Sequence, residues 1–313
     1  MAIIAIHRNQ RTFLSSHNDG ESTSATFSIS PDSKEAKLIT GRLGISEETH
    51  NLLSRHADLI VEWNDRLNLI SRKDCNRDIV FGRHILPSLA LAAIPEFPSK
   101  GKIVDVGTGG GFPGVPLAIA FPESEFLLVD SVGKKLKAIE EMTMELGITN
   151  VKTHYGRAEE IVDDPINGRK HKNSFDICVG RSVTSMPKFC FWIQDLLKQK
   201  DNEGQLYYII GGDVEKSVTS RLKGEYELGD LLGCAGASDK KALVLNASDV
   251  VKVAKESGQK RQTKAKTRSK STPRKPKSDP NDSSFTTSRG QWSKRDSSSQ
   301  KQRGYESFKR YEY

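Results

Sequence analysis

The sequence has few hydrophobic residues, few cysteines and no long apolar run. Hydrophobic side chains make up 35% of its 313 residues, below the roughly 45–50% of a typical globular protein, so we expect part of the chain not to fold. The four cysteines are scattered, without a C-x-x-C pair, which argues against a metal site or a disulfide framework and is typical of a reducing compartment. No run approaches the ~18 apolar residues of a membrane span, so we expect no membrane association.

Positive charge is concentrated at the C-terminal end of the chain. Residues 255–313 carry 17 Lys and Arg against 6 Asp and Glu, whereas residues 1–254 carry 31 against 34. The net charge of +8 and the pI of 9.2 therefore come from the tail. They do not indicate a basic face on the folded body.

Composition divides the chain into four segments. Residues 1–40 start basic, Ser-rich and without acids, which is typical of an organelle transit segment or of an ordinary disordered N-terminus. Residues 41–100 repeat apolar side chains at three- and four-residue spacing and predict a helical region, with Ser46 as an N-cap. Residues 101–254 predict the folded core. Residues 255–313 are nearly free of apolar side chains and predict a disordered tail.

Strand and helix patterns alternate within the core, which predicts an α/β fold with a parallel sheet. We expect strands at Lys102–Val106, Glu125–Asp130, Val151–His154, Phe175–Val179, Gln205–Ile210 and Ala242–Asn246. We expect helices at Ile85–Ala93, Val115–Ala120, Lys134–Leu146, Ala158–Val162 and Lys188–Leu197. The pattern of residues 214–238 favours neither structure.

A glycine-rich loop follows the first strand and indicates a nucleotide-containing cofactor. Glycines permit both a sharp turn and the close approach of a ligand to the backbone. The dinucleotide pattern G-x-G-x-x-G, read from Gly107, is broken at Phe112, although Gly109–Gly114 satisfies it after two extra residues. Asp105–Gly111 instead fits D-x-G-x-G-x-G, the S-adenosylmethionine signature of Rossmann-like methyltransferases.

Acidic residues follow the second and third strands. Asp130 closes the second strand, where a carboxylate accepts hydrogen bonds from ribose hydroxyls. The third strand leads into Tyr155–Glu159, where a backbone amide and a carboxylate are placed to bracket an adenine ring. Each feature alone has a structural explanation, since glycines tighten turns and Asp130 can cap a helix. Because all three features lie at successive strand ends, we favour a methyltransferase over a dehydrogenase.

Five separate motifs between Gly44 and Ala254 also resemble the patterns of one known family, the ribosomal small-subunit methyltransferase G family. The P-G-x-P-L extension of its glycine loop is far more specific than a bare glycine loop. The matching segments are Trp63–Ser71 for W-N-x-x-x-N-L-T-S, Arg83–Ser88 for R-H-I-x-D-S, Asp105–Leu117 for D-V-G-T-G-x-G-x-P-G-x-P-L, Asp130–Lys135 for D-S-x-x-K-[KR] and Gly180–Val183 for S-R-A-[FV].

The resemblance implies a Rossmann-like class I S-adenosylmethionine-dependent methyltransferase. Its sheet is expected to have seven mostly parallel strands with an antiparallel last strand, preceded by the N-terminal helical region. Members of the family transfer a methyl group from S-adenosylmethionine to guanine N7 of small-subunit ribosomal RNA, so that RNA or the small subunit is the expected partner. Guanine N7 carries an in-plane lone pair, and its methylation therefore needs alignment rather than deprotonation. We expect a monomer.

The resemblance also assigns site residues. It places at the cofactor Gly107, Phe112, Ala158, Glu159 and Arg181, to which the strand-end argument adds Asp105, Gly109 and Asp130. Candidates for the pocket that receives the RNA or the methyl group are Asn68, Arg83, His84 and Arg181, and no catalytic residue is assigned. Structural alternatives are an ion pair for Arg181 and a packing or capping role for His84.

Three positions depart from the family patterns. Pro87 replaces the aspartate of R-H-I-x-D-S, and Ile70 replaces the threonine of N-L-T. Ile210 stands where the family usually has a lysine before a glycine, which predicts that a positive group near the methyl or phosphate site is missing. The cofactor motifs are complete, so these departures concern the RNA target.

The tail combines its cations with aromatic side chains, which suits contact with phosphates and unpaired bases. Its aromatic residues include Trp292, Tyr305, Phe308, Tyr311 and Tyr313. Three hypotheses remain: an RNA guanine-N7 methyltransferase, a methyltransferase of the same fold with another substrate, and an inactive RNA-binding or ribosome-assembly factor. If residues 1–40 are a transit segment, we expect the protein in a plastid or mitochondrion, and otherwise in the cytoplasm.

Overall fold

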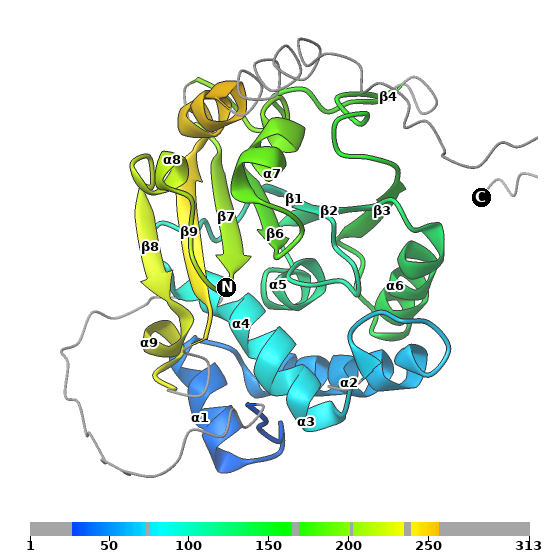
Figure 1. Ribbon diagram of the computed structural model, residues 1–313. Helices are drawn as coiled ribbons and strands as arrows, with labels where there is room; N and C mark the ends of the chain where they lie inside the picture. The colour runs from blue at the N-terminus through cyan, green and yellow to red at the C-terminus, as the bar shows by residue number, and fades with distance from the viewer. Residues whose placement is uncertain (1–26, 73–74, 165–168, 201–202, 235–238, 257–313) are drawn as a thin grey trace, which may run out of the picture. The chain divides into compact units, whose positions relative to one another are not determined.

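The computed structural model describes residues 27–72, 75–164, 169–200, 203–234 and 239–256 (Figure 1). Residues 1–26 of the expected leader and residues 257–313 of the expected tail lie outside these ranges. None of the helices in the described ranges is long and apolar enough to cross a membrane.

A seven-stranded sheet lies at the centre of the described chain. Its order is β3 (Val151–Tyr155), β2 (Glu125–Asp130), β1 (Lys102–Val106), β6 (Ile177–Arg181), β7 (Gln205–Ile210), β9 (Lys241–Asn246) and β8 (Gly224–Glu227). The first five of these strands are parallel, and β9 runs antiparallel to both of its neighbours. The predicted fold, a mostly parallel seven-stranded sheet whose last strand is antiparallel, is confirmed.

The strand order changes direction at β1. The chain moves from β1 outward through β2 to β3, and then returns to the other side of β1 to form β6 and β7. Parallel α/β sheets bind ligands at such a reversal, in the crevice beyond the carboxyl ends of the strands. The fold therefore places the candidate site beyond the ends of β1 and its neighbours.

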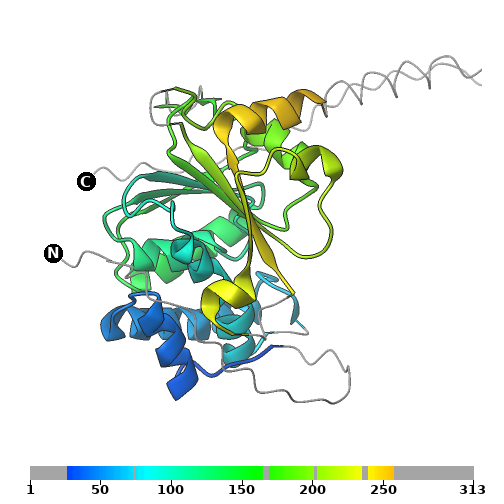
Figure 2. The ribbon, with the colours of Figure 1, turned by 90° about the vertical axis from the view of Figure 1, so that its left-hand side faces the viewer.

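Helices cover both faces of the sheet (Figure 2), and this explains why its strands are apolar. In a parallel sheet with two covered faces each strand is a nearly continuous hydrophobic run, as in the buried residues 103–106 of β1. One face is covered by α1 (Lys34–Arg42), α2 (Glu47–Asn64), α4 (Leu86–Ala90), α5 (Gly114–Ala120), α6 (Gly133–Glu145) and α9 (Leu228–Leu232). The other face is covered by α7 (Met186–Ile193), α8 (Lys216–Thr219) and helical residues 247–256.

The remaining elements are short. Between α2 and α4 lie α3 (Arg77–Val80) and the π-helical turn η2 (Phe81–Ile85), and the 3₁₀ turn η3 (Leu91–Ala93) follows α4. The strands β4 (Asp163–Asp164) and β5 (Arg169–Lys170) pair antiparallel, apart from the main sheet.

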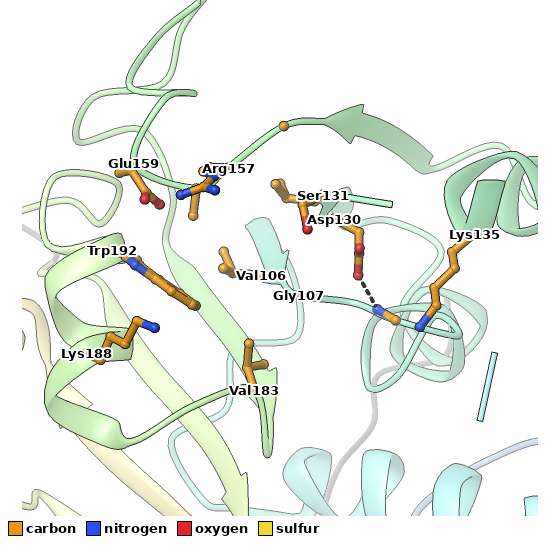
Figure 3. A pocket seen from close by; sticks show the side chains of 14 residues that line it. Val106, Gly107, Asp130, Ser131, Lys135, Arg157, Glu159, Val183, Lys188 and Trp192 are labelled. Atoms are coloured by element: carbon orange, nitrogen blue, oxygen red, sulfur yellow. Dashed lines mark hydrogen bonds between the residues drawn. The ribbon is translucent and has the colours of Figure 1, made fainter. Parts of the chain in front are cut away.

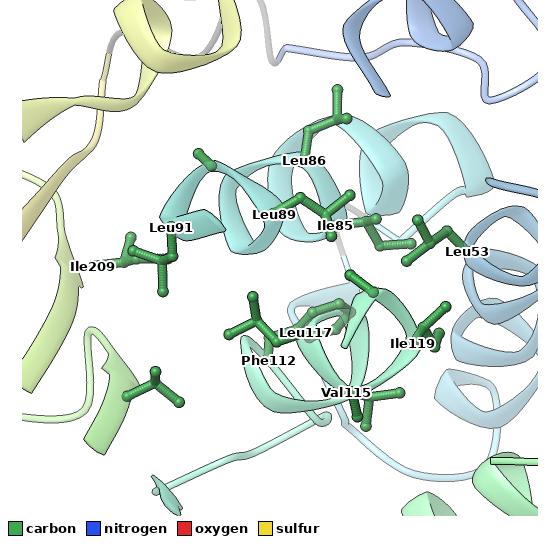
Figure 4. Close-up of a cluster of buried hydrophobic side chains, with 14 of the residues drawn as sticks. Leu53, Ile85, Leu86, Leu89, Leu91, Phe112, Val115, Leu117, Ile119 and Ile209 are labelled. Atoms are coloured by element: carbon green, nitrogen blue, oxygen red, sulfur yellow. The ribbon is translucent and has the colours of Figure 1, made fainter. Parts of the chain in front are cut away.

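The N-terminal helices share one hydrophobic core with the sheet. Leu53 of α2 and Leu89 of α4 are fully buried with Val115 and Leu117 of α5 in the same cluster (Figure 4). Because this cluster continues to Ile209 of β7, the helical region at residues 41–100 is packed onto the core rather than forming a separate body.

Helix α1 corrects the expected end of the leader at residue 40. The helix begins after Ser33, whose side chain accepts a hydrogen bond from Ala36 N, and it ends at Arg42. The residues that it buries are Ala36, Ile39 and Thr40. So few apolar positions leave little periodicity in the sequence, and the helix was therefore missed.

Three further expectations differ from the structure. Residues 158–162 form turns instead of a helix; Ala158 and Ile161 are both buried, and their three-residue spacing resembled a helical pattern. The fourth expected strand, Phe175–Val179, is shifted by two residues to Ile177–Arg181, since Phe175 forms only an isolated bridge with Leu197. The edge strand β8 was not expected, because its four residues are only partly buried.

Candidate active site

The glycine loop after β1 adopts a conformation that only glycine accommodates easily. Gly107, Gly109 and Gly111 have φ angles of 72°, 59° and 92°. A Cβ atom on Gly107 would lie 2.7 Å from Val183 Cγ1, so the loop has no room for a side chain there. The loop is tied to the next strand, since Val129 O accepts hydrogen bonds from Gly107 N at 2.8 Å and Thr108 N at 3.1 Å.

Asp105 lies beneath this loop and holds its two ends together. Its Oδ2 accepts hydrogen bonds from Thr108 Oγ1 at 2.7 Å and from Gly114 N, the first residue of α5, at 2.9 Å. Its Oδ1 is buried and has no hydrogen-bond partner among the described residues. Burial raises the pKa of Asp105 to about 7. Asp105 therefore positions the loop and is not among the residues that line the cavity above it.

A cavity of about 470 Å³ opens beyond the carboxyl ends of β1, β2 and β3 (Figure 3). It is large enough for a small-molecule ligand, since such sites span roughly 300–1,000 Å³. Of the predicted cofactor residues, it brings together Gly107, Gly109, Asp130, Ala158 and Glu159. Its other lining residues are Val106, Val129, Ser131, Lys135, Gly156, Arg157, Val183, Lys188 and Trp192.

Asp130 stands at the end of β2 and contacts both the glycine loop and the next helix. Its Oδ2 accepts a hydrogen bond from Gly109 N at 2.9 Å, and its Oδ1 accepts one from Val132 N at 2.9 Å. Each carboxylate oxygen has a second lone pair, so the group can still accept hydrogen bonds from a ligand. The position therefore suits the predicted recognition of ribose hydroxyls. The alternative role, helix capping, does not apply, because Val132 is itself the N-cap residue of α6 and that helix has no side-chain cap hydrogen bond.

Replacing Asp130 by alanine is expected to weaken S-adenosylmethionine binding about 10- to 100-fold, because hydrogen bonds to a charged group contribute roughly 1.5–3 kcal/mol. Calorimetric titration of the purified full chain measures this change. Asp176→Ala is the matched control. Asp176 Oδ2 also accepts a backbone hydrogen bond, from Lys102 N, but at the amino-terminal end of β1, away from the cavity. Equal affinities in the two variants would contradict the role of Asp130.

The far wall of the cavity combines the turn after β3 with helix α7. Ala158 is buried, whereas Glu159 is exposed and turns its carboxylate toward the cavity. Across from Asp130 lie Lys188 and Trp192, one turn apart on α7, with Lys188 Nζ 5.0 Å from the centroid of the Trp192 ring (Figure 3). A flat aromatic wall next to a carboxylate and backbone amides suits a purine ring.

Val183 closes the cavity between the two walls and is held by a buried tyrosine. The Tyr208 hydroxyl oxygen accepts hydrogen bonds from Val183 N at 2.8 Å and Thr184 N at 3.2 Å, and it donates one to Thr184 O. The turn after β6 is therefore fixed against the glycine loop, where Val183 contacts the face of Gly107.

The other predicted residues form a second group beside the cavity. Arg181, at the end of β6, donates from Nη2 to His84 Nδ1 at 2.6 Å, and its guanidinium carbon lies 5.1 Å from the centroid of the Phe112 ring. The His84 and Phe112 rings are 5.1 Å apart. Arg181 Nη1 is 3.4 Å from the Arg83 carbonyl oxygen. None of these four residues is among those lining the cavity, so direct cofactor contact by Phe112 and Arg181 stays a prediction.

His84 in this group is a neutral imidazole at physiological pH. Burial and then the three neighbouring cations lower its pKa to about 2. Since the Arg181 guanidinium is always a donor, His84 Nδ1 accepts and Nε2 carries the proton. Burial likewise lowers the pKa of Arg181 to about 10.

The segment after α2 brings the Trp63–Ser71 motif against the glycine loop. Asn64 Oδ1 accepts hydrogen bonds from Leu69 N at 2.8 Å and Ile70 N at 3.0 Å. This places Leu69 O 3.2 Å from the position of a Cβ on Gly110. The neighbouring Asn68 is exposed, while Ile70 is buried. The motif thus supports the loop, and a role of Asn68 toward RNA stays a prediction.

The departures at Pro87 and Ile210 receive different explanations. Pro87 is buried in the first turn of α4, where proline fits a helix and packs in the apolar core. Ile210 supplies no positive group, as expected, but Lys240, the residue before β9, brings a cation close to this end of β7. Ile210 pairs with Lys241 across the β7–β9 ladder, and the charge of Lys240 acts on both Arg181 and His84.

Several cavity residues were missed although their sequence context was visible. Lys135, Arg157 and Val183 fall inside motifs that the sequence singled out, but their side chains were not assigned. Lys188 and Trp192 carried only the signal of a helix face at four-residue spacing.

The residues present fit S-adenosylmethionine. The backbone at Gly109 is open toward the cavity, since a Cβ there would have only Gly107 O within 4 Å, at 3.9 Å. Asp130 can accept ribose hydroxyls, and Ala158 and Glu159 line the cavity together with the aromatic ring of Trp192. When bound, this cofactor supplies an activated methyl group.

Comparison with known proteins agrees with this reading of the site. The family model described as rRNA small subunit methyltransferase G matches residues 49–223, more than half of the chain. The ribosomal RNA small subunit methyltransferase G of Cytophaga hutchinsonii is 39% identical over 172 residues, covering 54% of this chain and 77% of that protein. The protein of the same name from Flavobacterium psychrophilum is 41% identical over 177 residues, covering 55% and 78%.

Among solved structures, a SAM dependent methyltransferase from Aquifex aeolicus is 16% identical with a TM-score of 0.38, and the match covers 50% of this chain and 89% of that one. The assignment rests on the family match and on the sequence relatives. By that match, which includes the glycine loop, Asp130 and Arg181, the chain belongs to the rRNA small subunit methyltransferase G family.

Proposed function

We propose that this protein transfers a methyl group from S-adenosylmethionine to guanine N7 of small-subunit ribosomal RNA. Family membership supports the cofactor and the RNA class. One observation of the structure carries the proposal furthest: Arg181, two residues before the cavity-lining Val183, belongs to a group of cations from three places in the chain, with Arg83 and Lys240. A polyanionic substrate is thereby drawn to the side of the cofactor.

The side chains of the site suit a nucleobase that is methylated without first losing a proton. Guanine N7 already carries a lone pair, so the protein has to align it with the methyl group rather than remove a proton. His84, the titratable imidazole of the group, is neutral, and its Nδ1 is occupied by the hydrogen bond from Arg181. The site therefore orients and holds its ligands without a free general base at this position.

We expect the purified full chain, given S-adenosylmethionine, to form 7-methylguanosine in small-subunit ribosomal RNA. Incubation with deproteinised RNA and with intact small subunits, followed by chemical cleavage at 7-methylguanosine, maps the position. A methyl group on another nucleotide or molecule would favour the same fold with a different substrate. Binding of both cofactor and RNA without any methylation would favour an inactive assembly factor.

Three further properties belong to the proposal. We propose that residues 255–313 tether RNA through their cations, that the protein acts as a monomer, and that an organelle imports it if residues 1–40 contain a transit segment. The compositions of the two terminal segments support the first and third statements.

A further inference from the structure

A group of charged residues gathers beside the cofactor cavity, and we name it the cationic cluster: Arg83, Arg181 and Lys240, with Asp239. The cations come from three places in the chain, namely η2, the end of β6 and the residue before β9. Figure 1 shows that the end of β7 and the beginning of β9 lie on the side of the sheet's strand ends that is nearest to α4. Gly211, just after β7, lies against the Asp239 carbonyl oxygen, which brings residues 239 and 240 to this edge.

The cationic cluster contains more positive than negative charge among the described residues. Asp239 Oδ2 is 3.6 Å from Arg83 Nη2, and Asp239 Oδ1 is 3.7 Å from Lys240 Nζ, so one carboxylate serves two cations. Asp105 acts on Arg181 from the loop side, but its own pKa of about 7 leaves it only partly ionised at neutral pH. The neighbouring His84 is neutral and cannot compensate the excess.

This excess charge is partly removed from water. The Lys240 side chain is 18% exposed and the Arg83 side chain 29%, whereas Asp239 is 59% exposed. Burial lowers the pKa of Lys240; Asp239 opposes this shift, while Arg83 and Arg181 add to it. Like charges held together with little water around them are unfavourable unless an anion joins them. The cationic cluster is thus complementary in charge to an anionic ligand.

The position of the cationic cluster outside the lining of the cofactor cavity favours an RNA phosphate, rather than the carboxylate of the cofactor, as its anionic ligand. None of the three cations is among the residues that line the cofactor cavity. A nucleotide joins its base to its phosphate through a single sugar, so a base presented to the cofactor has its phosphate close by. Lysine and arginine are the usual phosphate ligands.

We propose that Lys240, with Arg83 and Arg181, binds a backbone phosphate next to the nucleotide that is methylated, and thereby positions that base. The proposal rests on the proposed function, because it presumes an RNA substrate. It assigns to Lys240 a role that no motif of the sequence indicates: β7 ends in the uncharged Ile210, and the cation comes from the residue just before the neighbouring strand β9.

The test compares Lys240→Gln with Lys241→Gln in the full chain. Lys241 follows Lys240 directly but pairs with Glu225, at 2.6 Å, and is therefore a control of equal charge. We expect Lys240→Gln to weaken binding of deproteinised small-subunit RNA about tenfold. We also expect the slope of log affinity against log salt to fall by about 1, as for the loss of one phosphate contact. Lys240→Arg is expected to restore both values, and Lys241→Gln to change neither.

Cofactor affinity, measured on the same variants, separates the possible outcomes. Unchanged S-adenosylmethionine binding by Lys240→Gln shows that the variant is folded and that the anion is not the cofactor carboxylate. Weaker cofactor binding with unchanged RNA binding would overturn the proposal, as would an unchanged salt slope. If the wild type binds RNA with this Lys240 dependence but forms no 7-methylguanosine, the proposed function fails while the phosphate site stands.

Discussion

Replacing Gly107 by alanine is expected to weaken S-adenosylmethionine binding at least 100-fold, about 2.7 kcal/mol. The added Cβ would lie 2.7 Å from Val183 Cγ1, a distance at which something must move. Rotation of the Val183 side chain does not clear this contact, because its Cγ2 and Cβ lie 3.0 and 3.4 Å from the same position, and the Tyr208 hydroxyl holds its backbone N–H. The loop must shift instead, and with it the backbone that faces the cofactor. Calorimetric titration of the full chain measures the loss.

Gly147→Ala is the control that separates this contact from backbone strain. Gly147 has a φ of 69°, almost equal to the 72° of Gly107, but a Cβ there would meet no atom within 4 Å. Both variants are expected to lose roughly 1–2 kcal/mol of stability from the left-handed conformation. Only Gly107→Ala is expected to lose cofactor affinity. An equal loss in both would attribute the effect to strain and not to the contact with Val183.

The second large effect concerns stability in acid. His56 is fully buried against Phe112, and neither ring nitrogen has a hydrogen-bond partner among the described residues. Burial lowers its pKa from 6.5 to about 3. The folded chain keeps the ring neutral while the unfolded chain protonates it, so stability falls as the pH drops from about 6.5 toward 3. At pH 4.5 this residue alone costs about 2.7 kcal/mol relative to pH 8.

We therefore expect His56→Phe to recover about 2.7 kcal/mol at pH 4.5 and to change stability little, or raise it, at pH 8. Chemical unfolding at the two pH values measures both differences. His50→Phe is the contrasting variant, because the His50 ring nitrogens contact Thr40 Oγ1 and Pro31 O, each at 2.8 Å. Its loss of two buried hydrogen bonds is expected to destabilise the protein at pH 8. His84, whose pKa is also lowered, contributes an acid response in both proteins. A difference in stability between the two pH values that is as large in His56→Phe as in the wild type would therefore rule out this assignment.

The sheet could be predicted from the sequence because its strands are long, apolar and separated by helices. The bounds of β1, β2 and β7 agree with the expectation to the residue. Prediction failed where burial was partial. Helix α1 buries few side chains, β8 is a short edge strand, and the turn at residues 158–162 buries two apolar residues without being helical.

The residues of the candidate site could be predicted where a sequence motif falls at the end of a strand. Gly107, Gly109 and Asp130 act at strand ends, and a strand end is visible in a sequence. Asp105 is different, because the structure shows its carboxylate accepting hydrogen bonds from Thr108 and Gly114 within the loop, while its predicted contact with the cofactor stays a prediction. A carboxylate that holds a loop has the same sequence pattern as one that faces a ligand.

The cationic cluster lay beyond sequence reasoning for a different reason. Arg83 and Arg181 are about a hundred residues apart, and Lys240 approaches them only because β9 inserts antiparallel beside β7. The sequence around Ile210 and Lys240 does not indicate that β7 pairs with β9. Long-range strand pairing has to be known before a charge can be assigned to the site.

The reversal of strand order at β1 also leaves one strand end of the sheet outside the cofactor cavity. The strands on one side, β1 to β3, carry the glycine loop, Asp130 and the turn around Ala158, which line the cavity. On the other side, the segment after β6 contributes Val183 and helix α7, whereas Ile210 at the end of β7 is not among the lining residues. A substitution at the end of β7 can therefore change what is presented to the cofactor while the residues that hold the methyl donor stay the same.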